Sequence, residues 1–119
     1  MLVNVYRSKI HRARITRLDL DYEGSITLDE EMIRAAGLFP HERVQVLNHS
    51  TGDRMETYVI VGEKGSGVVG LNGPAARRGE VGDLVTIIAY AWLTEQEAKE
   101  WSPLTVTVDE NNRVSGARR

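Results

Sequence analysis

With 119 residues, the chain has the size of one ordinary domain, and its composition is that of a globular protein. Its net charge of −2, with both signs scattered, disfavours a nucleic-acid-binding protein, which usually carries a basic face. The absence of cysteine excludes a disulfide framework and a thiolate nucleophile. The apolar runs are far shorter than the roughly 20 residues of a membrane span, and residues 1–7 lack a signal-peptide pattern. We therefore expect a cytoplasmic protein without membrane or nucleic-acid partners.

The N-terminal third predicts strands around one short helix. β-Branched residues without helical spacing predict strand over 3–19, interrupted at 22–25 and resumed at 26–28. Asp29 is a typical N-cap, and the two glutamates after it suit the first turn of a helix. Gly37 is a typical C-terminal stop, so a short helix is expected between Asp29 and Gly37.

The central third predicts short strands joined by tight turns. Residues 44–48 lead into a turn at 50–53, and 57–61 form the return strand. A glycine-rich turn at 64–67 precedes a brief strand at 68–71.

The C-terminal third contains the most apolar predicted strand, at 84–91. Before it, 72–76 predict a turn that opens onto a short helical segment. After it, a Thr-x-x-Glu capping box at 94–97 predicts a helix of one or two turns. Residues 104–108 predict a last strand, and the polar tail from Asp109 is expected to be loose.

Many short strands, frequent glycine turns and a few helical segments predict a mainly β protein, a small mixed β-barrel that forms one domain over residues 1–119. No internal repeat or linker divides the chain. The three histidines, His11, His41 and His49, lack the spacing of metal ligands, so no metal site is predicted.

A series of short phrases in a fixed order carries more specific information. Each phrase is weak alone; Gly-Ser, for example, occurs at 24–25 and again at 65–66. The series comprises Lys9–Arg12, Asp21–Ser25, Ala35–Leu38, Val46–Asn48, Thr51–Arg54, Thr57–Tyr58, Glu63–Ser66, Asn72–Ala76 and Val81–Asp83. Through these phrases, from about residue 7 to residue 103, the chain resembles the bacterial aspartate 1-decarboxylase family. The resemblance implies a six-stranded double-psi β-barrel with short helices.

The resemblance implies a carboxy-lyase that converts L-aspartate to β-alanine and CO₂, which supplies pantothenate and coenzyme A synthesis. Loss of CO₂ from an α-amino acid leaves a carbanion, which needs a conjugated electron sink. Pyridoxal phosphate would need a lysine, and of Lys9, Lys64 and Lys99 the last two lie in a predicted turn and on a polar helix. A pyruvoyl group made from a serine of the chain meets the same need, because its ketone forms a Schiff base with the substrate amine.

By resemblance, this group arises from self-cleavage between Gly24 and Ser25. Ser25 Oγ attacks the carbonyl carbon of Gly24, β-elimination of the resulting ester cuts the chain, and hydrolysis of the dehydroalanine at position 25 releases ammonia. Gly24 permits the strained backbone that the attack requires, and the resemblance implies that Thr57 stabilises the oxyanion. The expected products are a small chain, 1–24, and a larger chain, 25–119.

Further roles follow residue by residue from the resemblance. Arg54 would bind the second carboxylate of aspartate, the one that is not lost, because a planar guanidinium suits a carboxylate, and Lys9 would add positive potential. Tyr58 would donate a proton to the carbanion, because a phenol is protonated at neutral pH. Strand alternation places Thr57 and Tyr58 on opposite faces, so both reach one site only through a twist of the strand or across a subunit boundary.

A loop and a residue before the cut complete the expected site. The residues expected to hold the substrate are Thr57, Asn72, Gly73, Pro74 and Ala75, while Tyr22 would seat the pyruvoyl end. Pro74 stands where many relatives carry alanine, and it removes one backbone donor. Leu47 stands where some relatives carry tryptophan; this difference would reshape a pocket wall, although a role in the core also explains Leu47 adequately.

Two alternatives stay open from the sequence. Residues 26–44 look like the strand–helix–strand unit of swapped-hairpin barrel transcription factors, which would make the chain a DNA-binding module. A structural relative that never cleaves itself is the other. The family itself implies a homotetramer with sites shared between neighbours, and cleavage that is spontaneous or assisted by a maturation factor.

Overall fold

Strands dominate the computed structural model, which describes all residues 1–119. The first half comprises β1 (Leu2–Arg14), β2 (Arg17–Asp19), β3 (Ser25–Asp29), α1 (Glu30–Ala36), β4 (Arg43–Asn48) and β5 (Arg54–Gly62). The second half comprises β6 (Val69–Asn72), the 3₁₀ helix η1 (Gly73–Arg78), β7 (Leu84–Thr94), α2 (Glu95–Glu100), β8 (Leu104–Val108) and β9 (Val114–Arg118). The predicted mainly β chain with short helices is confirmed. None of these helices has the length and hydrophobicity that a membrane crossing requires.

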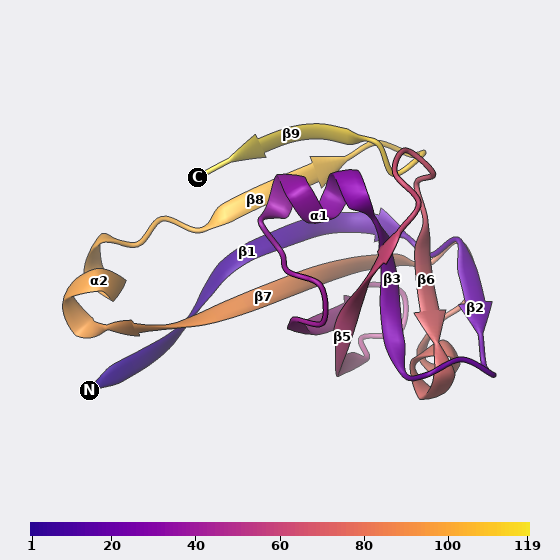
Figure 1. Cartoon of the computed structure of the whole chain (residues 1–119), viewed down its shortest axis with the longest axis horizontal. Coiled ribbons are helices and arrows are strands. Elements are labelled where there is room, and N and C mark those ends of the chain that lie inside the picture. Colours follow the sequence, from indigo (N-terminus) through magenta and orange to yellow (C-terminus); the bar gives the residue numbers. More distant parts are fainter.

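The nine strands form one mixed sheet in the order β2-β6-β3-β5-β4-β7-β1-β8-β9, where the resemblance implies six strands. The neighbours β2–β6, β3–β5 and β1–β8 run parallel, and the remaining neighbours run antiparallel. In Figure 1, β1 and β7 form a long arm with the N-terminus and α2 at its far end, while β2, β3, β5 and β6 gather at the opposite end. The arm accounts for the elongated dimensions of 43 × 28 × 25 Å.

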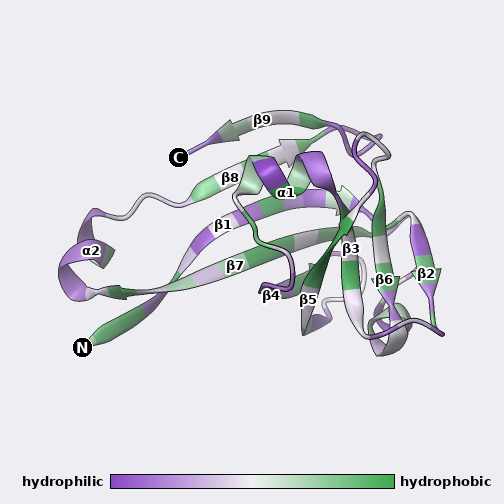
Figure 2. Cartoon of the chain, viewed as in Figure 1, coloured by the Kyte–Doolittle hydropathy of each residue, from purple (hydrophilic) through white to green (hydrophobic).

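The hydrophobic core is built from inward-facing residues of the strands together with one face of α1. Five of its members expose at most 1% of their surface: Ile10, Leu28, Met32, Val59 and Ile87. Figure 2 shows the apolar stretches concentrated along the strands, whereas α2 is hydrophilic. A fully buried aliphatic side chain stabilises the fold by roughly 1.5–3 kcal/mol, so this core fixes the strands that carry the site.

The predicted helix ends are confirmed in detail. The Asp29 carboxylate accepts a hydrogen bond from the backbone N–H of Glu31 at 2.8 Å, and Gly37 ends α1 with a φ of +66°. At α2, the Thr94 hydroxyl accepts from the Glu97 N–H while the Glu97 carboxylate accepts from the Thr94 N–H. Local side chains therefore define both ends of α1 and the start of α2.

The strand predicted over 3–19 is divided into β1 and β2. Within β1, the register against β7 shifts between Tyr6 and Ser8 and again between Ile10 and Ala13. A bulge moves a side chain to the other face of a strand, which explains why the apolar residues of β1 alternate imperfectly.

The prediction of a loose tail from Asp109 is wrong. Residues 114–118 form β9, which pairs antiparallel with β8. The cause is Asn112, which is 2% exposed and adopts a φ of +61°. Its side chain accepts from the Arg14 N–H at 2.8 Å and donates to the carbonyls of Arg14, at 2.9 Å, and Gly67, at 2.8 Å. A polar tail is thus ordered by a buried amide, together with Val114, which packs against the core.

Replacing Asn112 by alanine is expected to lower the free energy of unfolding by about 2–4 kcal/mol, because it unpairs buried backbone groups and places alanine at a positive φ. Urea denaturation measures the loss. Asn111→Ala is the matched control, since the Asn111 side chain is exposed and makes no hydrogen bond. Equal stability of the two variants would contradict the role given to Asn112.

Candidate active site

Ser25 is the first residue of β3 and is fully buried. Its backbone pairs with Asn72 of β6 in the antiparallel ladder between these strands. Its hydroxyl donates a hydrogen bond to the Glu23 carbonyl at 2.9 Å and accepts one from Asn72 Nδ2, also at 2.9 Å. The same Nδ2 donates to Thr27 Oγ1 at 2.9 Å, so both amide hydrogens of Asn72 hold hydroxyls of β3. The orientation of the Ser25 hydroxyl is therefore fixed by its neighbours.

The segment before Ser25 lies directly against the start of η1. A Cβ on Gly73 would lie 2.6 Å from the Tyr22 carbonyl oxygen and 2.8 Å from the Gly24 nitrogen, and Gly73 has a φ of +61°. A Cβ on Gly24 would come within 3.4 Å of the Pro74 ring. Only glycine at position 73 allows these two backbones to approach so closely. The predicted loop and the predicted cleavage point are therefore neighbours in space.

Replacing Gly73 by alanine is expected to lower the free energy of unfolding by about 2–4 kcal/mol and to displace the 22–24 segment, because the added methyl group meets rigid backbone. Gly52→Ala is the control, since Gly52 has a φ of +80° but nothing within 4 Å of an added Cβ. The free energy of unfolding of Gly52→Ala should fall only by the smaller cost of placing alanine at a positive φ, about 1 kcal/mol. Urea denaturation of both variants separates the steric clash from the backbone strain.

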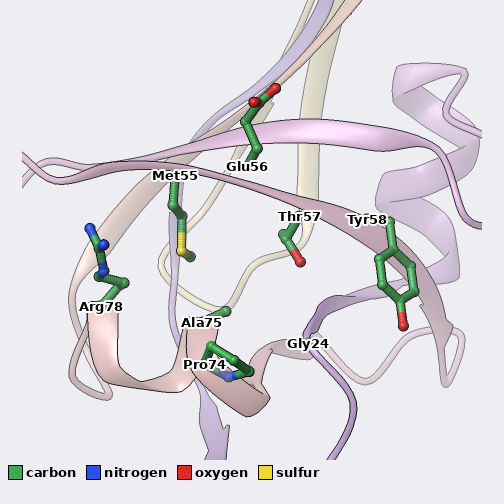
Figure 3. A pocket seen from close by; sticks show the side chains of 8 residues that line it. All are labelled: Gly24, Met55, Glu56, Thr57, Tyr58, Pro74, Ala75 and Arg78. Atoms are coloured by element: carbon green, nitrogen blue, oxygen red, sulfur yellow. The ribbon is translucent and has the colours of Figure 1, made fainter.

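A pocket of about 380 Å³ opens beside Gly24, within the range of small-molecule sites. Its lining residues come from the 22–24 segment, β5 and η1, and they are Gly24, Met55, Glu56, Thr57, Tyr58, Pro74, Ala75 and Arg78. Figure 3 shows Thr57 and Tyr58 pointing toward Gly24 and the η1 loop, while the Glu56 carboxylate points away. Thr57 and Tyr58 thus line one pocket within a single chain, although they are adjacent in the strand.

Tyr58 has the clearest electrostatic perturbation in this pocket. Its hydroxyl donates a hydrogen bond to Glu23 Oε2 at 3.4 Å. Desolvation raises the pKa of Tyr58, and the negative charge and hydrogen bond of Glu23 raise it further. The phenol therefore stays protonated at neutral pH, in the form that can donate a proton.

Lys9 and Arg54 do not line this pocket. Arg54 lies on β5, and its guanidinium donates to Gln45 Oε1 at 3.1 Å in a separate groove, which Tyr90 also lines. The Lys9 ammonium lies over the ring of Tyr6, 5.2 Å from its centre. Each chain alone therefore brings together only part of the predicted site.

The remaining predicted residues lie close to the Gly24–Ser25 bond or outside the pocket. Tyr22 is half exposed, just before Glu23. Asn72 is 1% exposed and contacts Ser25 rather than the open pocket. Leu47 pairs with Arg54 in the β4–β5 ladder and does not line the pocket, so the expectation that it shapes a wall is not met by this chain alone.

Sequence reasoning missed Met55, Glu56 and Arg78 as pocket residues. Met55 could have been found, because it is two residues before Thr57 on one strand and therefore shares its face. Arg78 could not, since its position depends on how η1 turns back toward β5 after the loop.

The fold and this pocket define a small mainly β protein with a buried serine beside a ligand-sized cavity. Comparison with known sequences identifies its family. The model of the aspartate decarboxylase family matches residues 1–115. The chain belongs to the aspartate decarboxylase family, whose curated members are carboxy-lyases. This membership favours an enzyme over the DNA-binding alternative.

Individual relatives agree with the family over nearly the whole chain. An aspartate 1-decarboxylase of Salinibacter ruber is 56% identical over 118 residues, which cover 99% of this chain and 81% of the relative. One of Caldicellulosiruptor saccharolyticus is 54% identical, covering 96% of this chain and 89% of the relative. One of Carboxydothermus hydrogenoformans is 52% identical, covering 96% and 90%.

Proposed function

We propose that this chain cleaves itself between Gly24 and Ser25, forms a pyruvoyl group at position 25, and uses it to decarboxylate L-aspartate to β-alanine and CO₂. The observation that carries the proposal is the position of Ser25. It is buried next to a pocket that Gly24 lines, and its hydroxyl is held by Glu23 and Asn72. A serine held in this position is suited to become the pyruvoyl group, because that group must lie at the substrate site.

The cleavage needs only groups of this chain and water. Ser25 Oγ bonds to the carbonyl carbon of Gly24, and the amide nitrogen leaves with a proton, which converts the peptide bond to an ester. Loss of the Ser25 α-proton then breaks the Oγ–Cβ bond, leaving a carboxylate on Gly24 and dehydroalanine at position 25. Addition of water to the latter releases ammonia. Thr57 is the proposed donor to the oxyanion of the first step, because its side chain points toward Gly24.

The residues around position 25 suit the proposed chemistry. When present, the pyruvoyl group supplies a ketone that joins the substrate amine and takes up the electrons released with CO₂. The Tyr58 hydroxyl stays protonated beside the pocket and delivers a proton to the substrate carbon. Gly73 and Ala75 hold the substrate through backbone groups, and Asn72 orients residue 25 through its amide, while Pro74 has no N–H to offer.

A site shared between subunits is part of the proposal. Lys9 and Arg54 lie outside the pocket of their own chain. In the homotetramer that the family resemblance implies, a neighbour supplies these cations to the substrate carboxylate. The same proposal includes the double-psi β-barrel of the family resemblance, a role in pantothenate and coenzyme A synthesis, and cleavage that is either spontaneous or assisted by a maturation factor.

The first test is the intact mass of the purified protein after incubation, alone and with cell extract. The expected result is two fragments, one ending at Gly24 and one that begins with a pyruvoyl-blocked residue 25, together with release of β-alanine from L-aspartate. A single 13.3 kDa chain under every condition would refute self-processing and identify a structural relative that never cleaves.

A further inference from the structure

Arg78 is the only cationic residue that lines the pocket beside Gly24. It is the last residue of η1, and Figure 3 shows it on the far side of Met55 from Thr57 and Tyr58. The only acid of the pocket lining, Glu56, points its carboxylate away. The pocket therefore has one positive wall, opposite the wall formed by the proposed proton donor.

The backbone of Arg78 is anchored, while its guanidinium is held by one weak ion pair only. The Arg78 carbonyl accepts a hydrogen bond from Asn48 Nδ2 at 3.1 Å, and Asn48 is 5% exposed. The guanidinium has a single ionic neighbour, Asp53, at 3.9 Å, and no hydrogen bond. A half-exposed pair at this separation is weak, so a carboxylate ligand competes with it readily.

We propose that Arg78 binds the side-chain carboxylate of the substrate, the one that is retained, as a second carboxylate-binding residue besides Arg54. The inference rests on the proposed function. A guanidinium paired with the carboxylate that leaves as CO₂ would stabilise the ground state and slow the reaction. A guanidinium at the far wall suits the other carboxylate, since it can form a bidentate fork there without opposing CO₂ loss.

The assignment predicts a preference for ligands with two carboxylates. A dicarboxylate that spans the pocket engages Arg78 at one end, whereas a monocarboxylate lacks the second contact. Arg78 thus acts on substrate affinity and leaves the proton transfer to Tyr58.

The test compares Arg78→Ala with Arg77→Ala, a neighbouring arginine of the same helix that is exposed and does not line the pocket. Both variants should cleave as the parent chain does, by intact mass. Arg78→Ala should raise the KM for L-aspartate about three- to tenfold with little change in kcat, as for a partly exposed charged hydrogen bond. Inhibition by succinate should weaken by the same factor, inhibition by propionate should not change, and Arg78→Lys should recover part of the affinity.

Unchanged KM and succinate inhibition in Arg78→Ala would overturn the inference and leave Arg54 as the only guanidinium for the carboxylate. A parent chain that never cleaves would instead refute the proposed function, and the mass shows this before any kinetics. Succinate binding by calorimetry does not depend on the pyruvoyl group. In that case equal succinate affinity of Arg78→Ala and Arg77→Ala overturns the inference by itself.

Discussion

Replacing Ser25 by alanine is expected to leave the chain in one piece and to reduce aspartate decarboxylation to the background of the assay. Alanine has no oxygen to attack the Gly24 carbonyl, so neither the ester nor the pyruvoyl group forms. The fold should tolerate the change, because Ser25 is small and Asn72 keeps its second hydrogen bond, to Thr27. Intact mass reports the cleavage, and β-alanine production reports the activity.

The second Gly-Ser pair of the chain offers a matched control for this experiment. Ser66 follows Gly65 just as Ser25 follows Gly24, but its hydroxyl donates to the Glu63 carbonyl in an exposed turn. Ser66→Ala should cleave and turn over normally. Fragments from Ser25→Ala with the same masses as those of the parent would show that cleavage does not use the Ser25 hydroxyl.

Replacing Tyr58 by phenylalanine is expected to lower kcat about 10²- to 10⁴-fold, the usual contribution of a positioned general acid, while cleavage at Gly24 continues. The ring keeps its packing, and only the hydroxyl that donates to Glu23 is lost. Normal processing by mass together with low kcat separates a defect in proton transfer from a defect in maturation. A variant that retains full kcat would remove Tyr58 from the reaction.

The pH profile gives an independent test of the same residue. Because desolvation and the charge of Glu23 raise the pKa of Tyr58, the protonated donor persists to a higher pH than for a free tyrosine. Activity that depends on this proton is complete below the pKa and falls as the pH rises through it. Glu23→Gln removes the charge, so its alkaline limb should lie at lower pH than that of the parent. Coincident limbs would exclude control by Glu23.

Local signals in the sequence predicted the helices well, because their cause lies within a few residues. The Asp29 cap, the αL residue Gly37 and the Thr94–Glu97 capping box each depend on contacts inside one turn. The order of the sheet could not be predicted in this way. The parallel pairing of β3 with β5, for example, joins strands that are separated by α1 and β4, and no local pattern specifies it.

The candidate site shows the same division between local and distant causes. Ser25, Thr57, Tyr58 and the 73–75 loop were predicted by resemblance, and all lie at or beside the pocket. Arg78 escaped prediction, because its approach to β5 depends on tertiary packing of η1. The ordered C-terminal strand escaped as well, because its anchor is one buried asparagine within a polar stretch.

The ladder between β1 and β7 extends from the Leu2–Thr94 pair to the Arg14–Leu84 pair. In the proposed mature form, with the backbone cut at Gly24, this ladder joins two polypeptides. The small fragment is then a separate molecule, held to the large one by strand pairing and by side chains such as Ile10 alone. Unfolding becomes dissociation, so the melting temperature of the cleaved protein should rise with protein concentration. Refolding becomes an encounter of two polypeptides, and dilution slows it for the mature form but not for the uncut Ser25→Ala chain.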